Sequence, residues 1–161
     1  MANLVVAPDQ EAITIDTFIA APPERVFQAI TDPSQLVQWW GQPGAYRTTN
    51  LQIDLRRGGY WRSSGVGADG KPFHVEGEYR EVDPPRVLAY TWRPSYRQIP
   101  ETLVRWQLEA EDKGTRVRLN HSGFVGAADA CKDHGNGWMK VLSWMQAFVE
   151  RNETIDSRTA A

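Results

Sequence analysis

The sequence has little cysteine and no long apolar segment. Cys131 is the single cysteine among 161 residues, which excludes an internal disulfide and favours a reducing compartment. No segment approaches the roughly 20 apolar residues of a membrane-spanning helix. The first residues also lack the basic flank and the longer apolar stretch of a signal peptide. We therefore expect a cytoplasmic protein without a membrane span.

Charge of one sign is equally scarce. The 18 basic and 20 acidic residues give a formal net charge of −2, without the basic excess that would neutralise nucleic-acid phosphates. Motifs for nucleophilic or nucleotide chemistry are missing too. The pattern Gly-x-Ser-x-Gly does not occur, and Gly65-Val66-Gly67 lies in an expected hairpin rather than before a helix. We expect no nucleic-acid partner and no cofactor.

The chain holds only three histidines. His134 lies three residues after Cys131, which places both side chains on one face of a helix. A structural zinc site usually takes four protein ligands and a catalytic site three plus water. Two neighbouring candidates do not make such a site, and the sequence predicts no metal.

Aromatic residues are abundant, with seven tryptophans, five tyrosines and five phenylalanines. Many of them alternate with polar or small residues along expected strands, and alternation with a period of two places one set on a single sheet face. The inward sets are Leu88, Tyr90 and Trp92; Val104, Trp106 and Leu108; and Val117, Leu119 and His121. Large amphipathic side chains in this number indicate either a broad core or an aromatic-lined site.

The order of elements predicts an α+β fold. We expect seven strands, at residues 12–20, 51–55, 60–66, 72–82, 86–93, 102–111 and 115–123, and the tight turns between the last six predict an antiparallel sheet. Two short helices follow the first strand, one beginning at Pro22-Pro23-Glu24 and one capped by Asp32-Pro33-Ser34. We expect one domain over residues 1–161, with its core at about 12–152 and frayed ends.

The last expected element is an amphipathic helix over about residues 128–152. Trp138, Val141, Leu142, Met145, Phe148 and Val149 follow the i, i+3, i+4, i+7 pattern of a helix that buries one face. Gly135 and Gly137 each cost about 1 kcal/mol inside a helix relative to alanine. Either the helix begins after them, or they let something approach closely.

Several short motifs, taken in order, resemble one superfamily. They are Ala21-Pro22-Pro23-Glu24-Arg25-Val26-Phe27, Thr31-Asp32-Pro33, Trp39-Trp40-Gly41, Gly58-Gly59, Gly77-Glu78-Tyr79, Asp83-Pro84-Pro85 with Leu88 to Trp92, and Gly137-Trp138. The chain resembles the SRPBCC superfamily of START-like, birch-pollen-allergen-like helix-grip domains. Within it, the chain is most similar to the branch named after the activator of the heat-shock chaperone ATPase.

This resemblance implies a seven-stranded antiparallel sheet wrapped around the long C-terminal helix, with a hydrophobic cavity between them. Members bind lipids, hormones, polyketides or other apolar molecules, and some are aromatases, cyclases or hydrolases. The eukaryotic chaperone activators carry a separate N-terminal domain that supplies much of the chaperone contact. About 11 residues precede the first expected strand here, so we expect that domain to be absent.

The candidate ligand-binding residues are Trp40, Tyr79, Tyr90, Trp92, Trp106, His121, Trp138, Leu142 and Met145. These side chains either line a cavity or interdigitate as ordinary core. His121 has the inward parity of its strand, where an imidazole acts either as a general base or as a hydrogen-bonded core residue, so it is only a weak catalytic candidate. Trp40 and the loop Pro94–Pro100 are candidate gates at the mouth.

The sequence predicts binding of a small hydrophobic or aromatic molecule in this cavity. Two alternatives stay open. One is a cofactor-independent cyclase, aromatase or hydrolase that uses the same cavity, and the other is partner binding like that of a chaperone-ATPase activator. The sequence does not decide whether the protein forms a homodimer.

Overall fold

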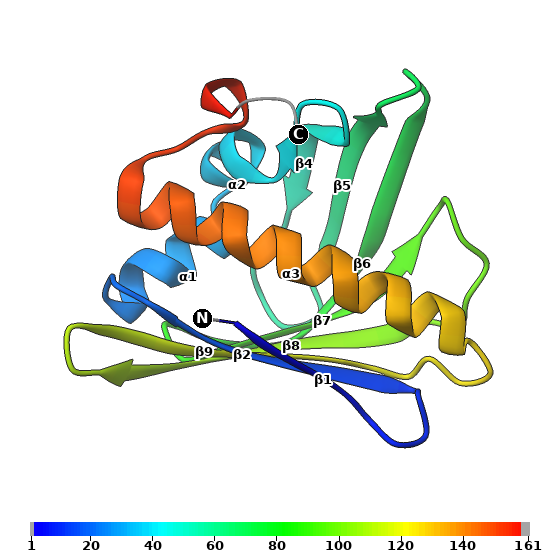
Figure 1. Ribbon diagram of the computed structural model, residues 1–161, viewed down its shortest axis with the longest axis horizontal. Helices are drawn as coiled ribbons and strands as arrows, with labels where there is room; N and C mark the ends of the chain where they lie inside the picture. The colour runs from blue at the N-terminus through cyan, green and yellow to red at the C-terminus, as the bar shows by residue number, and fades with distance from the viewer. Residues whose placement is uncertain (1, 159–161) are drawn as a thin grey trace.

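The computed structural model describes residues 2–158, in which an antiparallel sheet curves around a long helix (Figure 1). In chain order the elements are β1 (Asn3–Val6), β2 (Ala12–Ile19), α1 (Pro23–Thr31), α2 (Pro33–Trp39), β3 (Gly41–Gln42), β4 (Tyr46–Ile53), β5 (Tyr60–Gly67), β6 (Pro72–Asp83), β7 (Val87–Pro94), β8 (Thr102–Glu111), β9 (Gly114–Ser122), α3 (Ala128–Arg151) and the 3-10 turn η1 (Ile155–Ser157).

The sheet has nine strands in the order β1-β2-β9-β8-β7-β6-β5-β4-β3, so the prediction of seven was wrong. The two additional strands lie at the edges, where β1 pairs with β2 and β3 pairs with β4. β1 is a short apolar run without alternation, and three of its four residues are exposed. β3 is a Gly-Gln pair in a stretch whose glycines are typical of a turn, so the sequence did not predict a strand there. The α+β class and the antiparallel pairing are confirmed.

The two short helices form where their start signals stand. Pro23 occupies the first turn of α1, where its missing N–H costs nothing, and the helix buries Val26, Phe27 and Ile30. Asp32 caps α2 by accepting a hydrogen bond from the Ser34 backbone N–H at 2.9 Å. Hydrogen bonds from Ser34 stabilise the carboxylate and lower the pKa of Asp32.

α3 lies across the concave face of the sheet (Figure 1). It begins at Ala128, so it runs through Gly135 and Gly137 rather than after them. Its apolar face, including Trp138, Leu142 and Met145, is buried. No helix within residues 2–158 combines the length and the apolar character needed to cross a membrane.

The sheet bends between β7 and β6. A Cβ atom on Gly77 would lie 1.9 Å from the Thr91 carbonyl oxygen, so the close approach of these two backbones requires glycine. The register of β6 against β7 also shifts between Tyr79 and Glu81. As a result β7, β8, β9, β2 and β1 lie under α3, whereas β4, β5 and β6 form an arm that rises past it (Figure 1).

Candidate ligand-binding cavity

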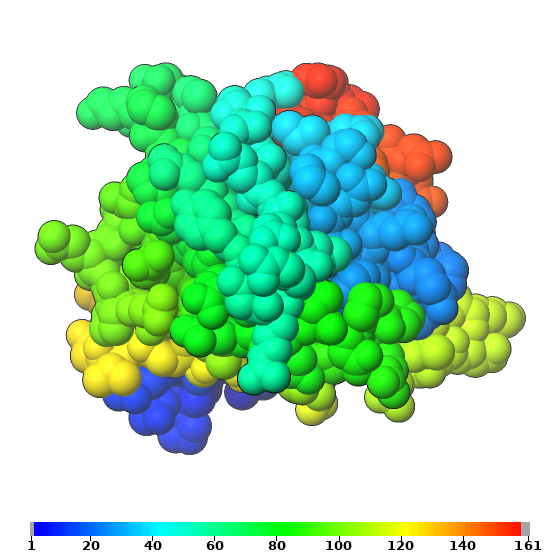
Figure 2. Space-filling model, turned by 180° about the vertical axis from the view of Figure 1, so that it is seen from behind, coloured from blue at the N-terminus to red at the C-terminus, as the bar shows by residue number. Residues whose placement is uncertain are grey.

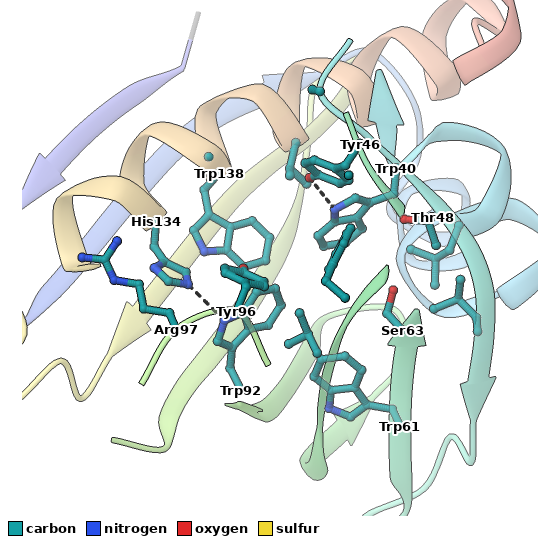
Figure 3. A pocket seen from close by; sticks show the side chains of 18 of the residues that line it. Trp40, Tyr46, Thr48, Trp61, Ser63, Trp92, Tyr96, Arg97, His134 and Trp138 are labelled. Atoms are coloured by element: carbon teal, nitrogen blue, oxygen red, sulfur yellow. Dashed lines mark hydrogen bonds between the residues drawn. The ribbon is translucent and has the colours of Figure 1, made fainter. Parts of the chain in front are cut away.

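A cavity of about 660 Å³ lies between α3 and the arm of β4, β5 and β6. Its wall is rich in aromatic residues. Figure 3 labels the lining residues Trp40, Tyr46, Thr48, Trp61, Ser63, Trp92, Tyr96, Arg97, His134 and Trp138. From behind, the chain from β4 into β5 covers the middle of the molecule between α1 and α2 on one side and β6 and β7 on the other (Figure 2).

Strand and helix periodicity explain which residues reach the cavity. The inward-facing residues recur every two positions on the strands and every three or four positions on α3. On the strands they include Trp61 and Ser63 of β5, Phe73 and Val75 of β6, and Tyr90 and Trp92 of β7. On α3 they include His134, Gly137, Trp138 and Val141.

Five of the nine predicted ligand-binding residues line the cavity: Trp40, Tyr79, Tyr90, Trp92 and Trp138. The other four, Trp106, His121, Leu142 and Met145, do not line it and are at most 2% exposed. They lie in the packed core because α3 rests on the central strands and separates only from the arm. Whether any of the nine binds a ligand stays a prediction.

Apart from Tyr79 of β6, the sequence reasoning missed the contributions of the arm. Trp61 alternates with Ser63 along β5, and this signal was available but not assigned to a face. Tyr46 stands after a turn rich in glycine and proline, which hid its strand. His134 was considered only as a metal ligand beside Cys131.

The two tryptophans at the end of α2 have different roles. Trp39 is fully buried and donates from Nε1 to the Ala29 carbonyl oxygen at 2.9 Å. Trp40 is half-buried, lines the cavity and donates from Nε1 to the Tyr46 hydroxyl at 3.0 Å (Figure 3). Trp40 therefore forms part of the wall, while Trp39 fixes α2 to α1.

His121 lies in a closed hydrogen-bond network. Trp138 Nε1 donates to His121 Nδ1 at 2.9 Å, and His121 Nε2 lies 2.7 Å from Thr102 Oγ1. Because an indole nitrogen only donates, Nδ1 is unprotonated and Nε2 carries the proton. Thr102 Oγ1 accepts that proton's hydrogen bond and donates to the Trp92 carbonyl oxygen at 3.3 Å. Both ring nitrogens of His121 are thus engaged inside the protein.

His134 is held in the opposite tautomer. Its Nδ1 lies 2.8 Å from the Ala130 carbonyl oxygen, which only accepts, so Nδ1 carries the proton. Its Nε2 accepts a hydrogen bond from Trp92 Nε1 at 3.2 Å (Figure 3). Burial, followed by the neighbouring His134, holds the pKa of His121 well below the ordinary value of 6.5, and burial also lowers the pKa of His134. Both imidazoles are neutral near pH 7.

The tyrosines of the wall are protonated. Burial raises the pKa of Tyr46, Tyr79 and Tyr90 well above the ordinary value of 10, and it raises the pKa of Tyr96 to about 12. Burial opposes the charged phenolate in each case. At neutral pH these side chains offer hydroxyl groups and no negative charge.

The mouth of the cavity is spanned by an ion pair. Arg97, in the loop after β7, lies 2.5 Å from an Asp133 carboxylate oxygen on α3. Next to Arg97, the Tyr96 ring meets the edge of Phe73 with centroids 5.8 Å apart. The ion-paired side chains are 35% and 61% exposed, so the pair contributes little to stability. It joins the loop to the helix where the cavity opens.

Within residues 2–158 no three His, Cys, Asp or Glu side chains come together as a metal-binding group. Cys131 is buried, and both ring nitrogens of His134 are already hydrogen-bonded. The absence of a metal stays a prediction.

Solved structures share this architecture. A protein from Chromobacterium violaceum is 26% identical, with a TM-score of 0.77 over 87% of this chain and 97% of that one. A protein from Mycobacterium smegmatis is 25% identical, with a TM-score of 0.78 over 91% and 94%. An AHSA1-like protein from Aeromonas hydrophila is 24% identical, with a TM-score of 0.75 over 88% and 93%, and shows likeness of fold. No curated protein matches the sequence.

The family comparison covers most of the domain. The model of the family described as "Activator of Hsp90 ATPase homolog 1-like protein" matches residues 20–150, from the end of β2 almost to the end of α3. The match spans the arm, the central strands and the helix that enclose the cavity. The chain therefore belongs to this branch of the SRPBCC superfamily.

Proposed function

We propose that the protein binds a small apolar or aromatic molecule in the cavity between α3 and the arm. The observation that carries the proposal is the cavity itself, with its volume of about 660 Å³ and its wall rich in aromatic residues. Ligand sites typically measure about 300–1,000 Å³ and combine apolar walls with a few convergent polar groups.

The cytoplasmic location stays a prediction, and the homodimer stays an open alternative.

The wall is held in place by hydrogen bonds, which supports this proposal. The indole groups of Trp40, Trp92 and Trp138 each donate to a neighbouring side chain at 2.9–3.2 Å. Side chains that are already fixed lose little conformational entropy when a ligand arrives. A ligand that buries about 200 Å² of apolar area gains roughly 5 kcal/mol before association costs, so polar contacts are needed for tight binding.

The enzyme alternative has less support from the geometry. A general base must reach the substrate with a free nitrogen. His121 is fully buried, does not line the cavity, and uses both nitrogens inside the protein. Partner binding like that of a chaperone activator has only the family description in its favour, and it becomes the next candidate if the ligand experiments fail.

Gly137 provides the sharpest test. It lines the cavity, and no heavy atom lies within 4 Å of the position of an added Cβ. We expect Gly137→Leu to raise the dissociation constant for the probe fluorene at least about tenfold, since the side chain enters the ligand space. Because glycine inside a helix costs about 1 kcal/mol, folding stability should not fall. Equilibrium dialysis and thermal unfolding measure the two effects.

Gly135→Ala is the matched control. Its added Cβ would make ordinary contacts of 3.5 Å with Ile13 and Leu4, away from the cavity. This variant should bind fluorene as the wild type does. Wild-type affinity in folded Gly137→Leu would contradict the proposed site. The proposal itself fails if the wild type binds no fluorene and native mass spectrometry of protein from its own host shows no adduct.

A further inference from the structure

The polar groups of the cavity wall have an unequal balance of donors and acceptors. Tyr79 lines the cavity and is 3% exposed, and its hydroxyl makes no hydrogen bond with any described residue. A phenol hydroxyl has one proton to donate and can also accept. Tyr79 therefore brings an uncommitted donor to the cavity.

Two further hydroxyls have already filled their role as acceptors. The Tyr90 hydroxyl accepts from Trp106 Nε1 at 3.0 Å, and the Tyr46 hydroxyl accepts from Trp40 Nε1 at 3.0 Å. Among the described residues neither hydroxyl proton has an acceptor. Each tyrosine can thus still donate, and the incoming indole bond polarises its O–H group and strengthens that donation.

A fourth donor stands beside them. The Nε1 atom of Trp61 is buried and has no partner among residues 2–158. An indole nitrogen can only donate. The Trp61 ring lies 5.1 Å from the Tyr90 ring, which in turn lies 6.0 Å from the Tyr79 ring, measured between centroids. The three rings therefore lie on three adjacent strands, β5, β6 and β7. Because Trp61 Nε1 is itself enclosed by the protein, the donor cluster open to a ligand is the pair of hydroxyls on Tyr79 and Tyr90.

The strong acceptors on the wall are either already hydrogen-bonded or exposed to solvent. His134 Nε2 accepts from Trp92, and the carboxylate of Asp133 pairs with Arg97 at the mouth. The other lining carboxylate, Asp69, accepts from the Lys71 backbone N–H and is exposed. The hydroxyls of Thr48 and Ser63 can donate or accept and so set no preference. Among the polar groups of the cavity wall, free donors therefore outnumber free acceptors.

We propose that the cavity selects neutral aromatic molecules that carry a hydrogen-bond acceptor, of the aryl ketone class, over aromatic molecules that carry only a donor. This inference rests on the proposed ligand-binding function. A ketone oxygen can accept from the donor cluster, whereas a ligand N–H placed there finds an acceptor only in a hydroxyl oxygen and leaves the hydroxyl protons unpaired, which carries a desolvation cost. Burial keeps the tyrosine pKa values high, so the donors persist throughout the neutral range.

Three probes of nearly the same tricyclic shape test the preference by equilibrium dialysis. Fluorenone carries a ketone acceptor, carbazole carries an N–H donor, and fluorene carries neither. A wall that recognises only apolar area would favour fluorene, the least polar of the three. We expect fluorenone to bind about tenfold more tightly than fluorene, and more tightly than carbazole, as one net hydrogen bond allows.

Tyr79→Phe locates the effect. Because the Tyr79 hydroxyl has no protein partner, this variant should fold normally, and its affinity for fluorenone should fall about fivefold with fluorene unchanged. The control Tyr60→Phe removes a half-exposed hydroxyl that bonds Glu76 outside the cavity, and it should keep the preference. If all three probes bind and fluorenone has no advantage, or Tyr79→Phe keeps that advantage, the donor inference is overturned and the proposed function stands. Binding of none of them contradicts the donor inference, and it contradicts the proposed function as well if native mass spectrometry of protein from its own host shows no adduct.

Discussion

Acidification from pH 6.5 to pH 5 should destabilise the folded protein steeply. His121 and His134 have folded-state pKa values below the ordinary 6.5, so in this window the unfolded chain binds more protons than the folded one. The stability that the two neutral imidazoles contribute is therefore fully present above pH 6.5, and it is lost as the pH falls toward their folded-state pKa values. Each imidazole contributes a slope of up to about 1.4 kcal/mol per pH unit, and the pair up to about 2.7.

The hydrogen bonds explain why these imidazoles resist protonation. Each has one nitrogen that accepts from an indole N–H, and a proton on that nitrogen would face a donor instead of an acceptor. Near His134 the charged groups are Arg97, which opposes protonation, and Asp133, which favours it. Urea unfolding at a series of pH values gives the slope.

His134→Gln separates the two contributions. The neutral amide removes one titrating group, so the slope between pH 5 and 6.5 should fall below the wild-type value. His74→Gln, which replaces a partly exposed histidine of β6 outside the cavity lining, controls for the loss of a histidine as such. Equal slopes in wild type and His134→Gln would show that His134 does not titrate as the network requires.

The sequence was sufficient to predict which residues face inward from the sheet. It was not sufficient to predict how far the helix lies from that face. Parity along β7 placed Tyr90 and Trp92 inward, and helical spacing placed Trp138 toward the sheet, and all three line the cavity. The same rules selected Trp106 and Met145, which are fully buried core. Parity specifies a face, whereas the gap depends on where the sheet bends. No parity rule locates that bend, which lies between β6 and β7, the strands that make the close backbone contact at Gly77.

Hydrogen-bond partners were also beyond the reach of the pattern. Trp138 and His121 lie 17 residues apart, and Trp92 and His134 lie 42 apart, so no local spacing pairs them. The prediction treated His121 as an inward imidazole with unknown partners. The amphipathic character of tryptophan predicted directional contacts in this wall, and the structure identifies their partners for Trp40, Trp92 and Trp138.

A second large effect is expected at Arg158, which fastens the C-terminal segment to the cavity wall. Its guanidinium donates to the carbonyl oxygens of Trp39 and Gly41 at 2.8 and 2.6 Å, and to that of Trp144 at 3.1 Å. The side chain is 5% exposed and lies over the Trp144 ring. The carbonyl of Trp39 belongs to the last turn of α2, where carbonyl groups lack helical partners.

Arg158→Met should lower the free energy of unfolding by about 3 kcal/mol, because hydrogen bonds from a charged donor are lost and buried acceptors stay unpaired. For a domain of this size the melting temperature should fall by about 6–12 °C. Arg151→Met is the matched control, since that side chain is 61% exposed and its nearest carboxylates are 4.0 Å away. The control should change stability by at most about 0.5 kcal/mol.

The hydrogen bonds of Arg158 are connected to the cavity through Trp40. Arg158 binds the backbone carbonyls on both sides of Trp40, whose indole lines the cavity and donates to Tyr46. Arg158→Met should therefore weaken fluorene binding even at temperatures where the variant is fully folded, while Arg151→Met should not. If Arg158→Met lost stability but kept wild-type affinity, the Arg158 hydrogen bonds would hold the C-terminal segment without fixing the position of Trp40 in the cavity wall. If both variants were equally stable, the three hydrogen bonds would contribute nothing measurable. The expected coupled loss follows because one guanidinium fixes the backbone on either side of a side chain that shapes the cavity.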